Sequence, residues 1–269
     1  LPGSRLDELK RFIQQQGWQW QPGAAIPYGE QIIVVSGGQT ARVNFWTRRR
    51  KLQVQAADSP LKTALRAWIS GGVAPDEAAA ALAGPHIGMD ESGKGDWFGP
   101  LVVAAVYADL ATMPRLHNLG VRDSKDLDAT TIRRLAAEID RLVPPEARHV
   151  WTIAPGEYNE LYARHNNINL LLAEAYAQVA RQVWDATQAP AIVCDQFAQN
   201  ADRLEQAFAV AGLPRPVQRH RAESASVAVA AASILASAAF TAAMEALGRE
   251  AGLKGALPKG ASDLEALDA

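Results

Sequence analysis

Apolar and polar positions along the first quarter of the chain follow first a helical and then a strand-like pattern. Apolar residues recur at helical spacing after Ser4, which can cap a helix, and Gly17 can end that helix. Alternation of apolar and polar residues then predicts strands, followed by a second helix. The predicted elements are helices over 5–16 and 61–70 and strands over 30–36, 40–47 and 52–56. We expect a small antiparallel sheet with the helices on one face.

The longer second part alternates apolar strand-like runs with helical stretches. The predicted strands lie near 86–90, 101–108, 148–154, 190–195 and 216–220, and the predicted helices near 124–142, 156–164, 168–186, 200–211 and 224–248. Because the early strands follow each other closely and helices separate the later ones, we expect a mixed sheet covered by helices. The sequence therefore predicts an α/β chain with a small domain over 1–70, a linker over 71–84 and a larger domain over 85–269.

One uncharged stretch bears on where the protein resides. Residues Ser224 to Met244 carry no charge and are long enough to cross a bilayer. Most of them are Ala and Ser, which favour insertion only weakly, so a close-packed buried helix is the better interpretation. The polar first 25 residues and the single cysteine, Cys194, are typical of a reducing cytoplasm. We expect a cytoplasmic protein with no membrane partner.

Charge is divided unevenly between the two parts. Residues 1–75 hold 10 Lys and Arg against 4 Asp and Glu, whereas residues 76–269 hold 17 against 25. The net charges are therefore +6 and −8. A basic module joined to an acidic one is typical of a division of labour in nucleic-acid binding. Charge alone leaves a merely soluble basic surface equally open.

Four acidic residues stand at predicted strand ends or at a helix start. Asp90 and Glu91 end one strand, Asp195 ends another, and Glu223 precedes the uncharged helix. Neighbouring strand residues point to opposite faces, so Asp90 and Glu91 can meet one ligand only where the strand ends or bulges. If all four converge, they favour a hard divalent cation such as Mg²⁺. Each acid alone is more typical of a solvated strand end or a helix cap.

A glycine-rich loop, "SGKGD", follows the acidic pair. The spacing of a phosphate-binding P-loop is absent because Lys94 is followed by Gly95 rather than by Ser or Thr. The loop also leads into a strand and not into a helix, which disfavours a nucleoside triphosphate site. Lys94 between Gly93 and Gly95 can contact a backbone phosphate as a point charge.

Six motifs occur in a fixed order between residues 86 and 262. They are "GMDESGKGDWFGPLVVAAV", "RDSKDLD", "LYARHNNINLLLAEAYA", "VCDQFA", "RAESASVAVAAASILA" and "LPKGAS". Together they resemble the signature of ribonuclease HIII within the type 2 ribonuclease H family. The earlier segments "YGEQI" and "VNFW…KLQVQ" resemble the TBP-like domain that precedes the nuclease in that family.

The resemblance implies a ribonuclease H-like mixed sheet flanked by helices, preceded by a small α+β TBP-like domain. It implies an endoribonuclease that cuts the RNA strand of RNA–DNA hybrids with two Mg²⁺ or Mn²⁺ ions, leaving 5′-phosphate and 3′-hydroxyl ends. The implied catalytic and metal-binding residues are Asp90, Glu91, Asp195 and Glu223. The expected substrate-binding residues are Gly93, Lys94, Gly95, Ser124 and Lys125 in the nuclease and Arg42, Trp46, Arg48 and Arg49 in the first domain.

Three positions favour ribonuclease HIII over ribonuclease HII in this resemblance. They are Lys94 between two glycines, Glu223 as the fourth acid, and Ala261 in the closing motif. One position departs from the pattern: Ser237 stands where the family commonly has Lys or Arg, and Arg219, Arg221 or Lys254 are candidates to replace that cation. We expect a monomer that binds RNA–DNA hybrids. The alternatives are cleavage at single embedded ribonucleotides, as in ribonuclease HII, and a non-catalytic hybrid-binding protein.

Overall fold

A computed structural model describes residues 5–47, 51–69, 75–196, 202–219 and 221–258 of the 269-residue chain. The chain divides into two compact units, Leu1–Glu77 and Ala78–Ala269. The division falls inside a helix, α3 (Pro75–Ala83), which lies within the stretch predicted as a linker. The linker prediction overlooked this helix, in which Pro75 stands at the first position and an alanine run with high helix propensity follows.

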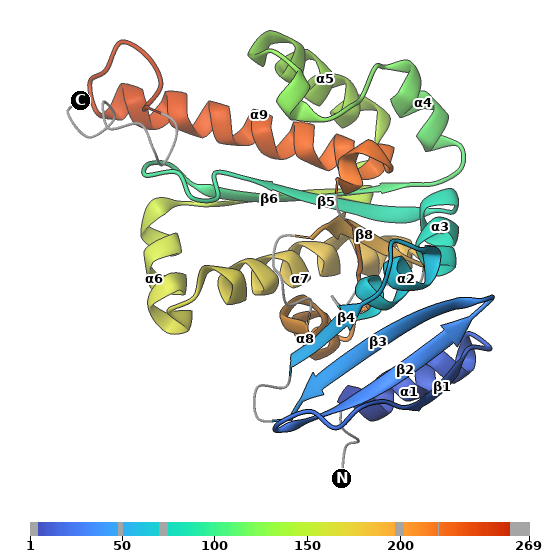
Figure 1. Ribbon diagram of the computed structural model, residues 1–269. Helices are drawn as coiled ribbons and strands as arrows, with labels where there is room; N and C mark the ends of the chain where they lie inside the picture. The colour runs from blue at the N-terminus through green and yellow to red at the C-terminus, as the bar shows by residue number, and fades with distance from the viewer. Residues whose placement is uncertain (1–4, 48–50, 70–74, 197–201, 220, 259–269) are drawn as a thin grey trace. The chain divides into compact units, whose positions relative to one another are not determined.

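The first unit is a four-stranded antiparallel sheet with two helices (Figure 1). Its elements are α1 (Arg5–Gln15), β1 (Gln19–Pro22), β2 (Gly29–Ser36), β3 (Gln39–Trp46), β4 (Lys51–Gln55) and α2 (Pro60–Ile69). Apolar side chains of both helices and of the alternating positions of β2, β3 and β4 form one buried cluster. Both helices therefore pack on the same face of the sheet, as the sequence predicts.

The second unit is a five-stranded mixed sheet with the strand order β7-β6-β5-β8-β9. Its strands are β5 (His86–Ser92), β6 (Leu101–Ala108), β7 (Arg148–Ile153), β8 (Ile192–Asp195) and β9 (Val217–Arg219). Strands β5, β6 and β7 pair antiparallel, whereas β8 runs parallel to β5 and β9 runs parallel to β8. The carboxyl ends of β5 and β8 therefore meet at the same edge of the sheet.

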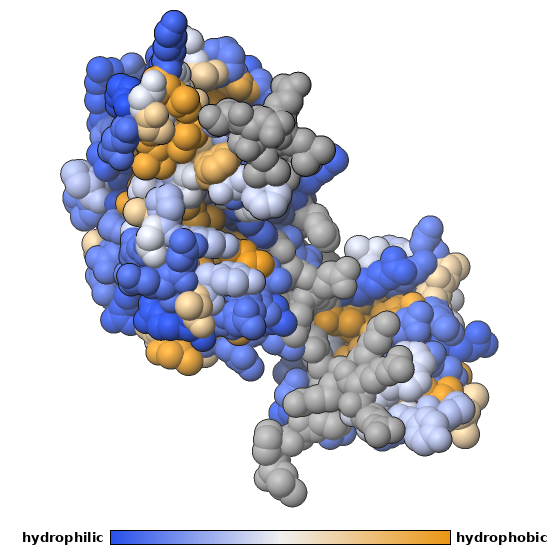
Figure 2. All heavy atoms as spheres, turned by 90° about the vertical axis from the view of Figure 1, so that its left-hand side faces the viewer, coloured by the Kyte–Doolittle hydropathy of each residue, from blue (hydrophilic) through white to orange (hydrophobic). Residues whose placement is uncertain are grey.

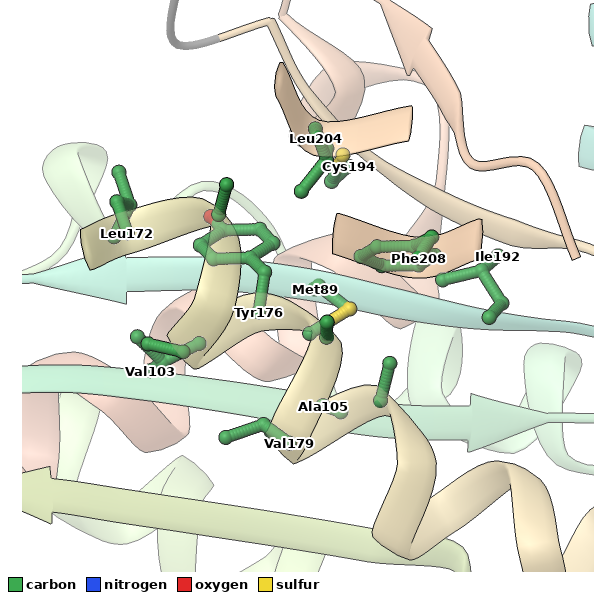
Figure 3. Close-up of a cluster of buried hydrophobic side chains, with 14 of the residues drawn as sticks. Met89, Val103, Ala105, Leu172, Tyr176, Val179, Ile192, Cys194, Leu204 and Phe208 are labelled. Atoms are coloured by element: carbon green, nitrogen blue, oxygen red, sulfur yellow. The ribbon is translucent and has the colours of Figure 1, made fainter. Parts of the chain in front are cut away.

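Helices cover both faces of this sheet (Figure 1). One layer holds α4 (Thr112–Asn118), α5 (Ala129–Leu142) and α9 (Val227–Glu250), and the other holds α6 (Pro155–His165), α7 (Ile168–Thr187) and α8 (Asp202–Val210). Figure 3 shows α7 and α8 side chains, among them Tyr176 and Phe208, packed around strand residues such as Met89. The α/β fold with a mixed, helix-covered sheet confirms the sequence prediction.

Helix α9 is long and apolar enough to cross a membrane by length and composition alone. In this fold, 67% of its most apolar stretch of 18 residues is buried inside the protein. A Cβ added to Gly88 of β5 would lie 2.1 Å from the backbone nitrogen of Val229 in α9, so only glycine permits this contact. The face of the molecule seen in Figure 2 is largely hydrophilic, with apolar patches between the hydrophilic residues.

The sequence interpretation missed or shifted three other elements. Strand β1 has little apolar alternation, and it forms by pairing with β2. Helix α4 contains Pro114 in its first turn, where proline is tolerated but weakens a sequence prediction. The helix predicted from residue 124 begins at Ala129, because Asp128 caps it and residues 124–126 form a separate 3₁₀ turn.

Candidate active site

Asp90 and Glu91 lie near the end of β5 in regular strand geometry. The pairing of β5 with β6 continues without a bulge through Asp90↔Ala104, Glu91↔Val103 and Ser92↔Val102. The two acids therefore point to opposite faces of the sheet, Asp90 toward α9 and Glu91 toward α7. The strand ends at Ser92, so both side chains still reach one cavity beyond it.

This cavity has a volume of about 620 Å³. Its lining includes three of the four predicted carboxylates, four of the predicted substrate-binding residues, and hydroxyl-bearing residues of α9. These groups are Asp90, Glu91 and Asp195; Gly93, Lys94, Ser124 and Lys125; and Ser233, Ser237 and Thr241. A second cavity of about 630 Å³ between α7 and α8 is lined by none of the predicted residues, so we place the candidate site in the first.

Glu223, the fourth predicted acid, is described but does not line the cavity. It lies in a 3₁₀ turn, Ala222–Ser224, before α9 begins at Val227. Burial raises the pKa of Glu223, and the negative charges of Asp195 and Asp123 raise it further. Within the described part of the chain, no three Asp, Glu, His or Cys side chains lie close enough together to hold a metal ion. The fold thus brings the four acids to one end of the sheet without gathering them into a ligand cluster.

The surroundings of Asp90 shift its pKa strongly. Burial, and then the adjacent charge of Glu91, raise the pKa of Asp90 to about 7. A hydrogen bond from Ser233 and the charge of Lys125 act in the opposite direction. The negative charge of Asp90 is therefore poorly compensated by the protein itself.

Glu91 is held by Tyr176 of α7, on the face of the sheet opposite the one that Asp90 faces. The Tyr176 hydroxyl donates a hydrogen bond to Glu91 Oε2, and Lys94 Nζ lies 3.6 Å from Glu91 Oε1. Tyr176 is fully buried, and burial followed by the charge of Glu91 raises its pKa well above the usual value, so it stays a neutral donor. Sequence reasoning missed Tyr176 because it stands among the apolar positions of α7 and is indistinguishable there from a core residue.

The loop before α5 contributes Ser124 and Lys125 to the cavity. Asp123 accepts a hydrogen bond from the Lys125 backbone nitrogen at 3.1 Å, so it caps this 3₁₀ turn. Ser124 Oγ lies 2.8 Å from Ser233 Oγ of α9. Sequence reasoning did not single out Ser233, whose hydroxyl reaches both Asp90 and Ser124.

Two positions in the glycine-rich loop favour glycine because of their backbone conformation. Gly93 and Gly95 have positive φ angles of 87° and 82°. A Cβ on Gly93 would also lie 2.2 Å from the carbonyl oxygen of Pro100. Gly93 lines the cavity, whereas Gly95 does not.

The remaining predicted residues belong to the first unit. Arg42 is exposed and Trp46 half-buried on β3. Their neighbours Ala41, Val43 and Phe45 point into the core, so Arg42 and Trp46 lie on the sheet face opposite the helices. Arg48 and Arg49 lie outside the described residues.

Comparison with known proteins assigns the chain to a family. The family model described as ribonuclease HII matches residues 87–266. A ribonuclease HIII of Oceanobacillus iheyensis is 39% identical over 264 residues, which cover 96% of this chain and 84% of that protein. The chain belongs to the ribonuclease HIII family. The resemblance drawn from the sequence motifs is therefore confirmed.

Other members of the ribonuclease HIII family match different shares of this chain. The ribonuclease HIII of Protochlamydia amoebophila is 42% identical over 184 residues, which cover 66% of this chain and 57% of that protein. The crystal structure of Bst-RNase HIII in complex with Mn²⁺ superposes with a TM-score of 0.62 at 29% identity, covering 96% of this chain and 84% of that one. The chain thus spans little more than half the length of the Protochlamydia relative.

Proposed function

We propose that this protein is an endoribonuclease that hydrolyses the RNA strand of RNA–DNA hybrids. The observation that carries the proposal is the joint lining of one cavity by Asp90, Glu91 and Asp195 in a chain of the ribonuclease HIII family. Two lysines, Lys94 and Lys125, line the same cavity and suit a polyanionic substrate.

The donor set fits a divalent cation such as Mg²⁺ or Mn²⁺. Carboxylate oxygens are the ligands that hard cations prefer, and the raised pKa of Asp90 marks negative charge that a cation would compensate. Asp90, Glu91, Asp195 and Glu223 would hold two such ions once binding draws them together, since these side chains do not form a ligand cluster in this structure. Bound there, the ions would activate a water molecule and stabilise the leaving 3′ oxygen, which yields 5′-phosphate and 3′-hydroxyl ends.

The chain's own side chains orient the carboxylates and bind the substrate. Ser233 and Tyr176 hold Asp90 and Glu91 through hydrogen bonds from opposite faces of the sheet. We assign Lys94 and Lys125 to backbone phosphates. The Gly93–Gly95 loop, which carries no side chain at its two glycines, suits a close approach to the minor groove, where 2′-hydroxyls are displayed.

In the first unit, we propose that the outer sheet face binds the hybrid without regard to sequence. The exposed Arg42 and the half-buried Trp46 lie on this face, and the net charge of residues 1–75 is +6. Arg48 and Arg49 would add phosphate contacts. We also propose that the protein is a monomer. A location in the cytoplasm is our further proposal, supported by the burial of α9 and by the single cysteine, Cys194.

The test uses two end-labelled duplexes with Mg²⁺ or Mn²⁺: a continuous RNA–DNA hybrid, and DNA with one embedded ribonucleotide. We expect cleavage of the hybrid at several sites and no detectable cleavage by Asp90→Asn. The matched control is Asp109→Asn, which changes the same residue type outside the cavity and keeps an oxygen that can accept the hydrogen bond from the Thr112 backbone nitrogen.

Three other outcomes of this experiment would each lead to a different conclusion. Preferential nicking at the single ribonucleotide would assign the activity of a ribonuclease HII. Binding of both duplexes without cleavage by either ion would assign a non-catalytic hybrid-binding protein. Equal loss of activity in Asp90→Asn and Asp109→Asn would contradict the assignment of the cavity as the active site.

A further inference from the structure

The second unit has a groove between α7 and α8 (Figure 1) that is separate from the candidate active site. Its volume is about 630 Å³, and it shares no lining residue with the candidate active site. Its lining residues in α7 run from Leu170 to Gln182, which is about 18 Å of helix at 1.5 Å per residue. The groove is therefore long enough for about three turns of a helix or about five residues of extended chain.

Two hydrogen bonds define the ends of this groove. At one end, Arg203 of α8 donates to Asn167 Oδ1, which caps α7, at 3.3 Å. At the other end, Arg181 of α7 donates to the carbonyl oxygen of Ala211, just after α8, at 2.7 Å. The two helices therefore run in the same direction, with Arg203 where both begin and Arg181 where α8 has ended.

Large apolar side chains are exposed along the groove. Val210 is 91% exposed and Leu170 is 39% exposed, and both line it. Single exposed apolar residues are normal on a protein surface, whereas apolar residues that line one concave surface are typical of a site for a protein segment. A partner that covers these side chains would remove apolar area from water, which favours binding.

Most of the charged side chains of the groove are already paired. His165 Nε2 lies 2.6 Å from Glu174 Oε2, and Arg181 Nε lies 2.8 Å from Asp185 Oδ1. Arg203 is bound to a neutral amide instead, and it forms no ion pair with any acid of the described ranges. The end of the groove at Arg203 therefore complements a negative charge.

The chemistry of the groove favours a peptide over a nucleic acid. A nucleic acid backbone is bound by several cations in a row, and an apolar groove with one uncompensated cation does not provide them. A single peptide carboxylate needs one cation, and the planar guanidinium of arginine matches its geometry. The amide side chains of Gln178, Gln182 and Gln206 also line the groove, and they can both donate to and accept from a peptide backbone.

We propose that the groove between α7 and α8 binds an amphipathic segment of another protein, with apolar side chains against Leu170 and Val210 and a carboxylate at Arg203. Because the groove and the candidate active site share no lining residue, such a partner would recruit the protein and leave the active site free. The inference goes beyond the proposed function and does not depend on it.

The test begins with a random library of 12-residue peptides displayed on phage. The whole protein is the bait, and excess heparin occupies its nucleic-acid-binding surfaces. Each selected peptide is then synthesised with a fluorescent label, and its affinity is measured by fluorescence anisotropy. We expect the selected sequences to combine apolar residues at helical or alternating spacing with Asp or Glu at one end.

Val210→Asp places a charge on the apolar lining. We expect it to weaken binding of a selected peptide at least about 10-fold, because the bound peptide would bury that charge without a partner. Ala209→Asp is the matched control, since it adds the same charge to an exposed position of α8 that does not line the groove. We expect less than about a 2-fold change in this control, as for an exposed charge.

Arg203→Ala tests the carboxylate. It should weaken binding about 3- to 10-fold, which is the range of one hydrogen bond, and it should have no further effect on a peptide whose acidic residue is replaced by the corresponding amide. Arg215→Ala is the control, because Arg215 pairs with Glu205 and does not line the groove. It should affect the acidic and the amide peptide equally.

Three results would overturn the inference. If no selected peptide loses affinity in Val210→Asp, the groove does not bind peptides. If Arg203→Ala weakens the acidic and the amide peptide equally, no carboxylate binds at Arg203. If wild type self-associates in analytical ultracentrifugation and Val210→Asp abolishes this, the occupant is a second copy of this chain. Thermal melting of each variant checks that it is folded.

Discussion

At the scale of single residues, the adjacent acids of β5 are oriented by different helices. Tyr176 of α7 donates to Glu91, and Ser233 of α9 donates to Asp90, from opposite faces of the sheet. Neither donor is an acid, and both are buried. Each carboxylate can therefore be perturbed separately without changing its charge.

Replacing Tyr176 by Phe keeps the buried ring and removes only the hydroxyl. We expect a roughly 10-fold lower kcat on the RNA–DNA hybrid with little change in KM, because Glu91 loses the donor that fixes its position, and a hydrogen bond to a charged group contributes about 1.5–3 kcal/mol. The Mn²⁺ concentration that gives a half-maximal thermal shift of the protein should rise in parallel.

Tyr158→Phe is the control for this change, since Tyr158 packs against the same core cluster. If Tyr158→Phe lowers kcat as much as Tyr176→Phe does, the loss reflects general packing and the assigned role of Tyr176 is wrong.

The raised pKa of Asp90 predicts a pH-dependent stability of the metal-free protein. Its pKa of about 7 in the folded state exceeds the ordinary aspartate pKa of 3.8, so the folded state binds the proton more tightly than the unfolded state does. Stability is then lost as the pH rises from about 4 to about 7, and the loss is complete above that range. Asp90→Asn removes this loss.

Urea unfolding in EDTA should therefore show that Asp90→Asn is more stable than wild type at pH 8, by at least about 1 kcal/mol, because one pKa unit corresponds to about 1.4 kcal/mol. The difference should shrink at pH 5. A difference that does not vary with pH would contradict this account. Added Mn²⁺ should stabilise wild type more than the variant.

At the scale of secondary-structure elements, α9 presents a row of hydroxyls to the cavity. Ser233, Ser237 and Thr241 are four residues apart, so they share one face of the helix and all line the cavity. The motif resemblance predicts Lys or Arg at the position of Ser237. The wall of the cavity formed by α9 is thus uncharged in this protein.

Ser237→Lys restores a cation to that wall. We expect it to tighten hybrid binding about 3- to 10-fold at low salt and to steepen the plot of log K against log[salt] by roughly 0.7–0.9, the value for one additional phosphate contact. Ala242→Lys is the matched control, because it adds the same charge to an exposed position of the same helix. An equal change of slope in both variants would indicate a general charge effect.

Most elements of the second unit could be predicted from the sequence because their apolar patterns match their burial. Strand β1 could not, since its pairing with β2 is a tertiary contact that four mostly polar residues do not encode. The four acids were recognisable from motifs and from their positions at element ends. Tyr176 and Ser233 were not, because a buried hydroxyl among apolar residues shows its partner only after folding. The separation of Glu223 from the cavity also depends on a local turn, Ala222–Ser224.

At the scale of the whole molecule, each unit has a hydrophobic core of its own. Leu9, Val34 and Leu65 belong to the cluster of the first unit, whereas the second unit buries clusters on both faces of its sheet. The two units also carry net charges of opposite sign. Because the two cores are separate, we expect a mutation in one core to destabilise its own unit and to leave the stability of the other unit unchanged.

Leu65→Ala removes a fully buried side chain from the first core. We expect a loss of about 2–5 kcal/mol in the stability of the first unit, with the unfolding of the second unit unchanged. Differential scanning calorimetry should resolve this as one transition that shifts to lower temperature and one that does not. A single transition that shifts as a whole would show that the two units unfold together.

Helix α9 has a consequence for the synthesis of this protein. It follows β5 and β6, the strands that it covers, by more than a hundred residues. At a translation rate of about 5–20 residues per second, these strands leave the ribosome several seconds before α9 does. During that interval the apolar face that includes Val102, Ala104 and Val106 lacks α9, the helix that packs most extensively on β5 and β6. Nascent chains of this protein should therefore be clients of chaperones that bind exposed apolar surface, until α9 emerges and covers the sheet.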